Sequence, residues 1–216
     1  EDAKKFIDEG FRTGQRGEFF TIGPMKLLQD GSLGARTAAM NEPYEGEGDN
    51  RGITLFEQGE LNELLEYFDR YQMQAAIHCI GDRAMKMVIE AITNSIYRKE
   101  NKKNRHGIVH AQITNQDILH AMKAHDILAY IQPVFVDLDM GIVEQQIGKQ
   151  RMEKIYAWKT MLDMGISVPG GSDAPVVSFD IMENIYFAVT RKSINGEPEE
   201  GWIPSEKITV DEAVKL

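Results

Sequence analysis

The chain has 216 residues, of which 42% are hydrophobic and 27% charged, as is typical of a globular protein with one sizeable core. Its formal net charge of −10 argues against nucleic acid or an anionic membrane surface as the main partner, because both require clustered basic side chains. A small-molecule substrate is therefore the expected partner.

Cysteine content and apolar runs constrain the compartment. The single cysteine, Cys79, excludes an intrachain disulfide framework and fits a reducing, cytoplasmic location. No run of about 18 apolar residues is present, so we expect no membrane span. The chain begins at Glu1 without an initiator Met or a signal peptide, and it stops inside a helix that a Thr209-x-x-Glu212 capping box opens. We infer a fragment of a longer polypeptide.

Short apolar segments alternate with amphipathic ones along the chain. The predicted strands are 22–28, 74–80, 107–112, 127–133 and 167–171. The predicted helices are 2–11, one from Thr54 to about 68, 83–98, one from Thr114 or Asn115 to about 125, 152–164, 180–191 and one from Thr209. Irregular regions are expected at 32–52, 134–148 and 192–207, with a polar linker at 99–105.

Strict alternation of strands and helices predicts an α/β fold with a parallel sheet, because right-handed crossovers connect such units. The sheet belongs either to a doubly wound fold or to part of a (β/α) barrel of the TIM type. No G-x-G-x-x-G follows any strand, which counts against a dinucleotide site.

Chemically active side chains stand at the predicted carboxyl ends of the strands. They are Lys26, His78, His110, Gln132 and Asp173. Active sites of parallel α/β folds form at that end. Imidazole nitrogens and a carboxylate suit zinc and similar divalent ions. We therefore expect a metal site, although a lone Asp or His after a strand is also a common turn, cap or core residue.

Two of these residues keep an alternative interpretation. Lys26 lies inside an apolar strand, where it either pairs with an acid such as Asp30 or reacts with carbon dioxide to give an anionic carbamate ligand. Cys79 alternates with His78 and is interpreted as a core residue. No functional role is assigned to the remaining histidines, which are His106, His120 and His125.

Four ordered segments resemble one enzyme family. They begin with Lys26-Leu-Leu-Gln-Asp-Gly-Ser-Leu-Gly, Ile77-His-Cys-Ile-Gly-Asp-Arg-Ala, Val109-His-Ala-Gln and Gly170-Gly-Ser-Asp-Ala-Pro. They resemble the amidohydrolase superfamily, and within it the branch called amidohydrolase family 3, which is related to N-substituted formamide deformylase. The resemblance extends in order over nearly the whole chain.

The resemblance implies a metal-dependent hydrolase of carbon–nitrogen bonds on a (β/α)₈ barrel, of which residues 1–216 would supply strands four to eight. It implies that Lys26 is a carbamylated bridging ligand and that His78 and His110 bind the metal. Asp173 would bind the metal and move the proton of the attacking water, with His110 assisting catalysis. The residues implied in the substrate pocket are Arg36, Tyr44, Asp82 and Gln132.

Two parts of the family pattern are missing from the sequence. The His-x-His pair of the first barrel strand is absent, and so are the N-terminal strands and the small β-sandwich. A five-strand portion would leave two open sheet edges, so a homo-oligomer is among the expected partners. The alternative function is a catalytically silent metal-binding or interaction module, and the isolated fragment is expected to be inactive.

Overall fold

A four-stranded parallel sheet forms the centre of the fold. The computed structural model describes residues 2–99 and 104–216, and its strands are β1 (Met25–Leu28), β2 (Ala75–Cys79), β3 (Gly107–His110) and β4 (Leu128–Tyr130). The strands lie in the order β1-β2-β3-β4, and every neighbouring pair is parallel. The predicted α/β class and the first four strands are therefore confirmed.

The two faces of the sheet differ in burial. The residues of one face are all buried, namely Leu27, Ile77, Ile108 and Ala129. On the other face, Lys26 is exposed, Leu28 is 50% exposed and His78 is half-buried. Because successive side chains alternate between faces, the first set packs under the helices and the second lines an open side.

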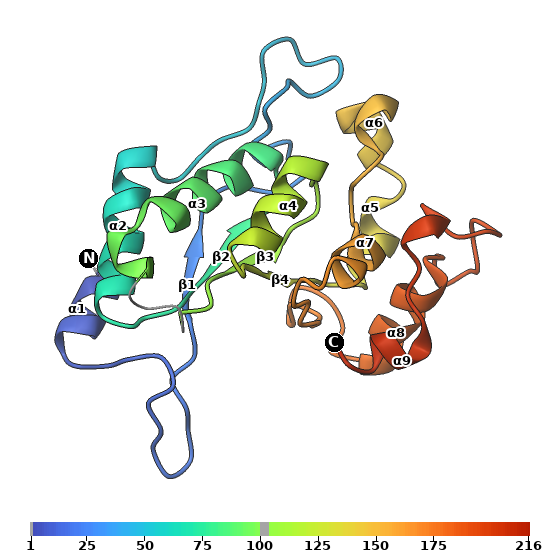
Figure 1. Ribbon diagram of the computed structural model, residues 1–216. Helices are drawn as coiled ribbons and strands as arrows, with labels where there is room; N and C mark the ends of the chain where they lie inside the picture. Colours follow the sequence, from blue (N-terminus) through green and yellow to red (C-terminus); the bar gives the residue numbers. More distant parts are fainter. Residues whose placement is uncertain (1, 100–103) are drawn as a thin grey trace.

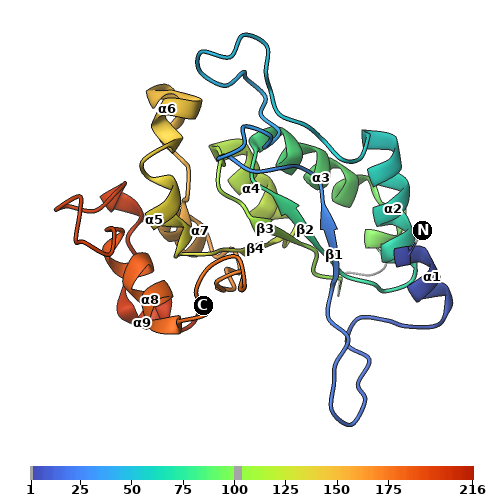
Figure 2. The same cartoon turned by 180° about the vertical axis from the view of Figure 1, so that it is seen from behind.

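Helices cover only the buried face. The three helices between the strands are α2 (Gln58–Arg70), α3 (Asp82–Asn94) and α4 (Gln116–Ala124). They lie together on one side of the sheet, and the view from behind shows the strands in front of them (Figures 1 and 2). Among the described residues, no helix is both long enough and apolar enough to cross a membrane.

The remaining helices flank the sheet. α1 (Asp2–Asp8) lies near the start of β1, and a 3₁₀ turn, Ile96–Lys99, follows α3. The elements after β4 are α5 (Phe135–Asp139), α6 (Val143–Ile147), the 3₁₀ turn Lys149–Arg151, α7 (Trp158–Asp163), α8 (Ile181–Thr190), the 3₁₀ turn Pro204–Glu206 and α9 (Val210–Ala213). They gather beside β4 (Figure 1).

The predicted fifth strand, 167–171, does not form a regular strand. Its backbone runs parallel to β4, with hydrogen bonds from Ala129 N to Ser167 O and from Ile131 N to Pro169 O, each 3.0 Å. One isolated bridge joins Ile131 and Gly170. Pro169 stands where the next donor of the ladder is needed, and proline has no N–H. The segment therefore follows the sheet edge with one hydrogen bond missing.

Several helix limits also differ from the prediction. α2 begins at Gln58 because Glu57, and not Thr54, forms the capping box with Glu60. The predicted helix 152–164 contains only α7, since the backbone of Tyr156 is left-handed, with φ of 47°. The region 134–148, expected to be irregular, contains α5 and α6. Most of the predicted linker 99–105 lies outside the described residues.

Candidate metal centre

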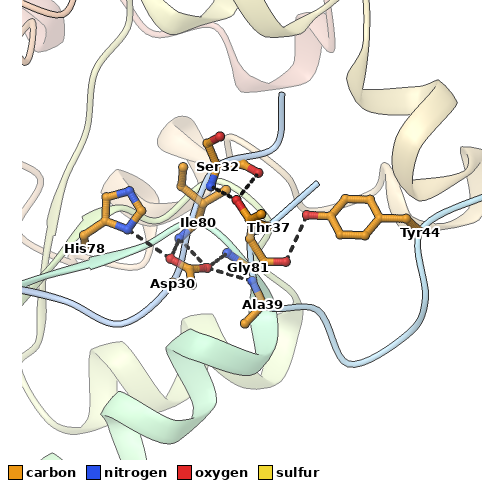
Figure 3. Close-up of polar contacts among 9 residues, drawn as sticks. Asp30, Ser32, Thr37, Ala39, Tyr44, His78, Ile80 and Gly81 are labelled. Atoms are coloured by element: carbon orange, nitrogen blue, oxygen red, sulfur yellow. Dashed lines mark hydrogen bonds and ion pairs between the residues drawn. The ribbon is translucent and has the colours of Figure 1, made fainter. Parts of the chain in front are cut away.

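A buried carboxylate, Asp30, ties the end of β1 to the start of α3. Its oxygens accept hydrogen bonds from the backbone N–H groups of Ala39 (3.0 Å), Ile80 (3.1 Å) and Gly81 (2.8 Å) (Figure 3). Asp30 is only 2% exposed. Backbone donors compensate a buried carboxylate for its lost hydration. The carboxylate is therefore fixed at the carboxyl end of the sheet.

His78 is oriented by this carboxylate. Its Nδ1 lies 3.0 Å from Oδ1 of Asp30 (Figure 3). An ionised carboxylate only accepts hydrogen bonds, so Nδ1 is the donor, and in the neutral ring this leaves the lone pair on Nε2. Many metal-binding histidines have the same carboxylate partner, which fixes the ring and makes the other nitrogen more basic. Asp30 therefore pairs with His78 and not with Lys26, contrary to one alternative drawn from the sequence.

His110 brings a second imidazole to the same place. The strand register pairs it with Cys79, so simple alternation would put it on the helix-covered face. Its φ of 77° ends the regular strand, and its ring instead contacts that of His78, with centroids 4.5 Å apart. Cys79 itself is fully buried in the core, as predicted.

The surroundings of His110 favour the neutral imidazole. Burial lowers its pKa to about 3, the nearby His78 and Lys26 act in the same direction, and Gln132 opposes the shift. Its Nδ1 is buried and has no hydrogen-bond partner among the described residues. A neutral imidazole with an unused buried nitrogen is a suitable metal ligand.

Lys26 and Asp173 lie near each other at the open side of the sheet. Desolvation lowers the pKa of Lys26, and the carboxylate of Asp173 opposes that shift. The side chain of Lys26 is nevertheless exposed, and its role as a ligand stays a prediction. Asp173 has φ of 62°, and left-handed backbone at residues other than glycine is frequent at functional sites.

The four predicted substrate residues hold the surrounding loops. Tyr44 is buried and its hydroxyl donates to Ala38 O at 2.9 Å. Asp82 accepts from the backbone N (2.8 Å) and side-chain Nδ2 (2.6 Å) of Asn41. The other two are Arg36, which pairs with Glu47, and Gln132, which donates to Tyr130 O at 3.1 Å. Their role in substrate binding stays a prediction.

The predicted ligands fall into two pairs. Across the described ranges, no group of three or more His, Cys, Asp and Glu side chains is arranged to hold a metal ion. The pair His78 and His110 nevertheless fits a divalent cation chemically. Each ring has a nitrogen available to coordinate a metal ion, and a carboxylate fixes the ring of His78. The second pair, Lys26 and Asp173, would supply oxygen ligands if the lysine were carbamylated.

Two contributors were not found by sequence reasoning. Asp30 appeared only as a partner for Lys26, and Phe135, which stacks on His110 with centroids 5.6 Å apart, was not noticed. The Asp-Gly-Ser that follows β1 was visible in the sequence, but only the structure shows which side chain its acid contacts. Nothing in the sequence around Phe135 signals the stacking.

Comparisons with known proteins agree with the motifs. The sequence profile described as "Amidohydrolase family" matches residues 1–216. The putative amidohydrolase YtcJ of Bacillus subtilis is 35% identical over 201 residues, covering 93% of this chain and 37% of the relative. The N-substituted formamide deformylase of Arthrobacter pascens is 26% identical over 198 residues, covering 90% of this chain and 35% of the relative.

The fold agrees with a solved structure as well. A crystal structure of an uncharacterized metal-dependent hydrolase from Pyrococcus furiosus matches with a TM-score of 0.82 at 26% identity, over 98% of this chain and 42% of that one. The architecture is therefore that of one portion of a larger known fold. The chain spans 37% and 35% of the lengths of the two curated relatives.

Proposed function

Because the chain belongs to the amidohydrolase family, we propose that residues 1–216 are part of a metal-dependent hydrolase that cleaves non-peptide carbon–nitrogen bonds of small amide-type molecules. The observation that carries the proposal is the pair of contacting imidazoles at the carboxyl end of the sheet, one fixed by Asp30 and the other with a buried, unpartnered nitrogen. Paired neutral imidazoles are suited to zinc.

The proposed fold of the native polypeptide is a (β/α)₈ barrel. In that fold the four strands and the segment 167–171 would correspond to strands four to eight. The match to a metal-dependent hydrolase over 98% of this chain supports the correspondence. The exposed face of β1 would then face the barrel interior, where the open side of the sheet carries Lys26 and His78.

In the proposed site, His78 and His110 would hold a divalent cation together with Asp173. The cation supplies Lewis acidity and lowers the pKa of water toward neutrality. Asp173 accepts the proton of the attacking water and delivers it to the leaving nitrogen, so the carbon–nitrogen bond breaks as the carbon–oxygen bond forms. Either His110 or the cation would steady the negative charge that develops on the carbonyl oxygen.

Lys26 is proposed as a carbamate. Desolvation lowers its pKa, and only a neutral amine reacts with carbon dioxide to give the carbamate and a released proton. Carbon-13 NMR after exposure to labelled bicarbonate tests this step. A carbamate signal in the wild type that disappears in Lys26→Arg is expected, and its absence from the wild type would overturn the assignment.

Metal removal tests the hydrolase proposal. Turnover of N-substituted formamides and other small amides is measured with the native polypeptide that carries residues 1–216, before and after dialysis against a chelator. We expect activity to disappear with the metal and to return when Zn²⁺ is added. Unchanged turnover in protein that elemental analysis shows to be free of metal would overturn the proposal.

A catalytically silent metal-binding or interaction module is the second candidate. It is favoured by the absence, among residues 2–99 and 104–216, of any cluster of three or more His, Cys, Asp or Glu side chains arranged to hold a metal ion. Elemental analysis combined with activity assays discriminates the two. Stoichiometric zinc together with detectable hydrolysis would exclude the silent module.

A further inference from the structure

A half-buried carboxylate behind the candidate metal centre, Asp139, has no role in the chemistry proposed above. Its Oδ2 accepts hydrogen bonds from the hydroxyl of Tyr156 (2.6 Å) and from Nε2 of Gln112 (3.1 Å). Burial raises the pKa of Asp139, and these two neutral donors oppose the rise. The carboxylate therefore joins three separate segments of the chain at one point.

The first of these segments is α5, which reaches from Asp139 back to His110. Asp139 is the last residue of α5, and Phe135 is the first. The ring of Phe135 stacks on that of His110, with an interplanar angle of 12°. Holding the end of α5 therefore also holds the aromatic surface against which His110 rests.

The second segment follows His110 directly. Gln112 lies two residues after His110, beyond the left-handed residues His110 and Ala111, with φ of 77° and 47°. Its backbone oxygen accepts from Tyr156 N at 2.8 Å, so the third segment is attached here as well. Asp139 thus joins α5, which carries the ring stacked on His110, to the backbone segment 110–112, which contains two left-handed residues.

We propose that Asp139 is a positioning residue for His110: it locks α5 and the segment 110–112 together, so that Phe135 and the backbone keep the imidazole against His78. The inference rests on the proposed function where it concerns metal binding. Buried partners of this kind commonly change metal affinity 10- to 100-fold when they are removed.

Zinc affinity provides the first test. Two variants of the native polypeptide weaken the contact without emptying the site: Asp139→Asn, which has nearly the same shape, and Tyr156→Phe, which keeps the ring and loses the donor. Each is expected to weaken Zn²⁺ binding about 10-fold in competition with a chromogenic chelator. The matched control is Asp137→Asn, which makes the same charge change on α5 and is expected to stay within about twofold of wild type.

A double variant separates positioning from general destabilisation. If Asp139 acts through His110, then Asp139→Asn adds no further loss of Zn²⁺ affinity in a His110→Ala background. Wild-type affinity in Asp139→Asn would overturn the inference. A further loss of about 10-fold on top of His110→Ala would also overturn it.

Histidine NMR gives a readout that does not depend on metal. In protein labelled with ¹⁵N at histidine, Asp139→Asn is expected to shift the ring signals of His110 and to leave those of the distant His106 unchanged. If the wild type binds no Zn²⁺, the proposed function fails, while a selective His110 shift still supports the positioning role. Unchanged His110 signals in Asp139→Asn would reject that role whatever the metal result.

Discussion

Two histidine–aspartate pairs lie at opposite ends of the same sheet and differ in how many nitrogens they use. His106, just before β3, is fully buried, and its Nδ1 accepts from Ala75 N at 3.0 Å while its Nε2 lies 2.9 Å from Asp69. His78, at the end of β2, uses only Nδ1, on Asp30, and its side chain is 13% exposed.

This difference separates a structural pair from a site. Both nitrogens of His106 are engaged, and Asn104 donates a further hydrogen bond to the Asp69 carboxylate, at 3.0 Å. Such a pair stabilises the amino end of the sheet, and neither of its ring nitrogens is available to bind a metal ion. His78 keeps one nitrogen free at the carboxyl end, where the second imidazole of His110 joins it. In this chain, the pair whose histidine keeps a ring nitrogen available for a ligand is the candidate site, and the pair with both nitrogens hydrogen-bonded is structural.

The largest expected effect is on stability and comes from breaking the structural pair. His106→Ala takes the imidazole away from the buried Asp69 carboxylate, which keeps its hydrogen bond from Asn104, and leaves a cavity in the core, so we expect the free energy of unfolding to fall by about 3 to 5 kcal/mol. Urea denaturation measures it. The control is His125→Ala, an exposed position, which is expected to change stability by less than about 0.5 kcal/mol. Similar losses in the two variants would contradict the assignment.

Removing His78 is expected to give the opposite result, with a large loss of metal binding and little loss of stability. His78→Ala should reduce Zn²⁺ affinity and hydrolysis by more than about 100-fold, since it deletes a proposed direct ligand rather than an outer partner. Its stability should change little because the ring is partly exposed. Isothermal titration and turnover assays test this, with the exposed His120→Ala as control. Retained affinity in His78→Ala would remove it from the ligand set.

Replacing Asp30, the carboxylate of the candidate site, is expected to reduce both stability and Zn²⁺ affinity moderately. Asp30→Asn replaces one acceptor oxygen by an amide that faces backbone N–H groups, so we expect a loss of about 1 to 3 kcal/mol in stability. Freeing His78 should also weaken Zn²⁺ binding about 10-fold. Asp69→Asn is expected to lose stability while its Zn²⁺ affinity stays unchanged, which would support the distinction between the two His–Asp pairs. Equal effects of the two variants on metal binding would contradict that distinction.

Acidification is expected to give the smallest effect, and the structural pair contributes to it through Asp69. Burial acts to raise the pKa of Asp69, but hydrogen bonds from His106 and Asn104 prevail and hold it below 3.8. The unfolded chain therefore binds the proton first, so this contribution is complete above about pH 4 and is lost as pH falls through the folded pKa. Urea denaturation at pH 5 and pH 3 should show a larger loss of stability in wild type than in Asp69→Asn, which has no carboxyl group to protonate at position 69. Equal losses would contradict the shift.

Sequence patterns predicted the elements wherever local periodicity decided them. Apolar runs gave β2, β3 and β4 within a few residues, and Asn115 and Asp180 cap α4 and α8 as expected. The prediction failed where tertiary contacts override the local pattern. Tyr156 interrupts an apparently helical run because its N–H bonds to Gln112 O. Pro169 removes a rung from an apparent strand because it has no N–H.

The candidate site divides in the same way. Motif order alone brought His78, His110 and Asp173 to one end of the sheet, since the carboxyl ends of parallel strands meet at one edge. Lys26 is exposed because the face of β1 that carries it is open, which the sequence does not show. Which acid pairs with which base could not be predicted, because Asp30 lies 48 positions from His78.

The sequence by itself therefore determined the family, the parallel α/β class and the residue types gathered at one edge of the sheet, because periodicity and motif order are local properties of the chain. The tertiary structure alone decided that Asp30 fixes His78, that His110 turns its ring out of the strand alternation, and that Asp139 lies behind it. These relations depend on distances between segments far apart in sequence and on left-handed backbone at His110, and no local pattern records either.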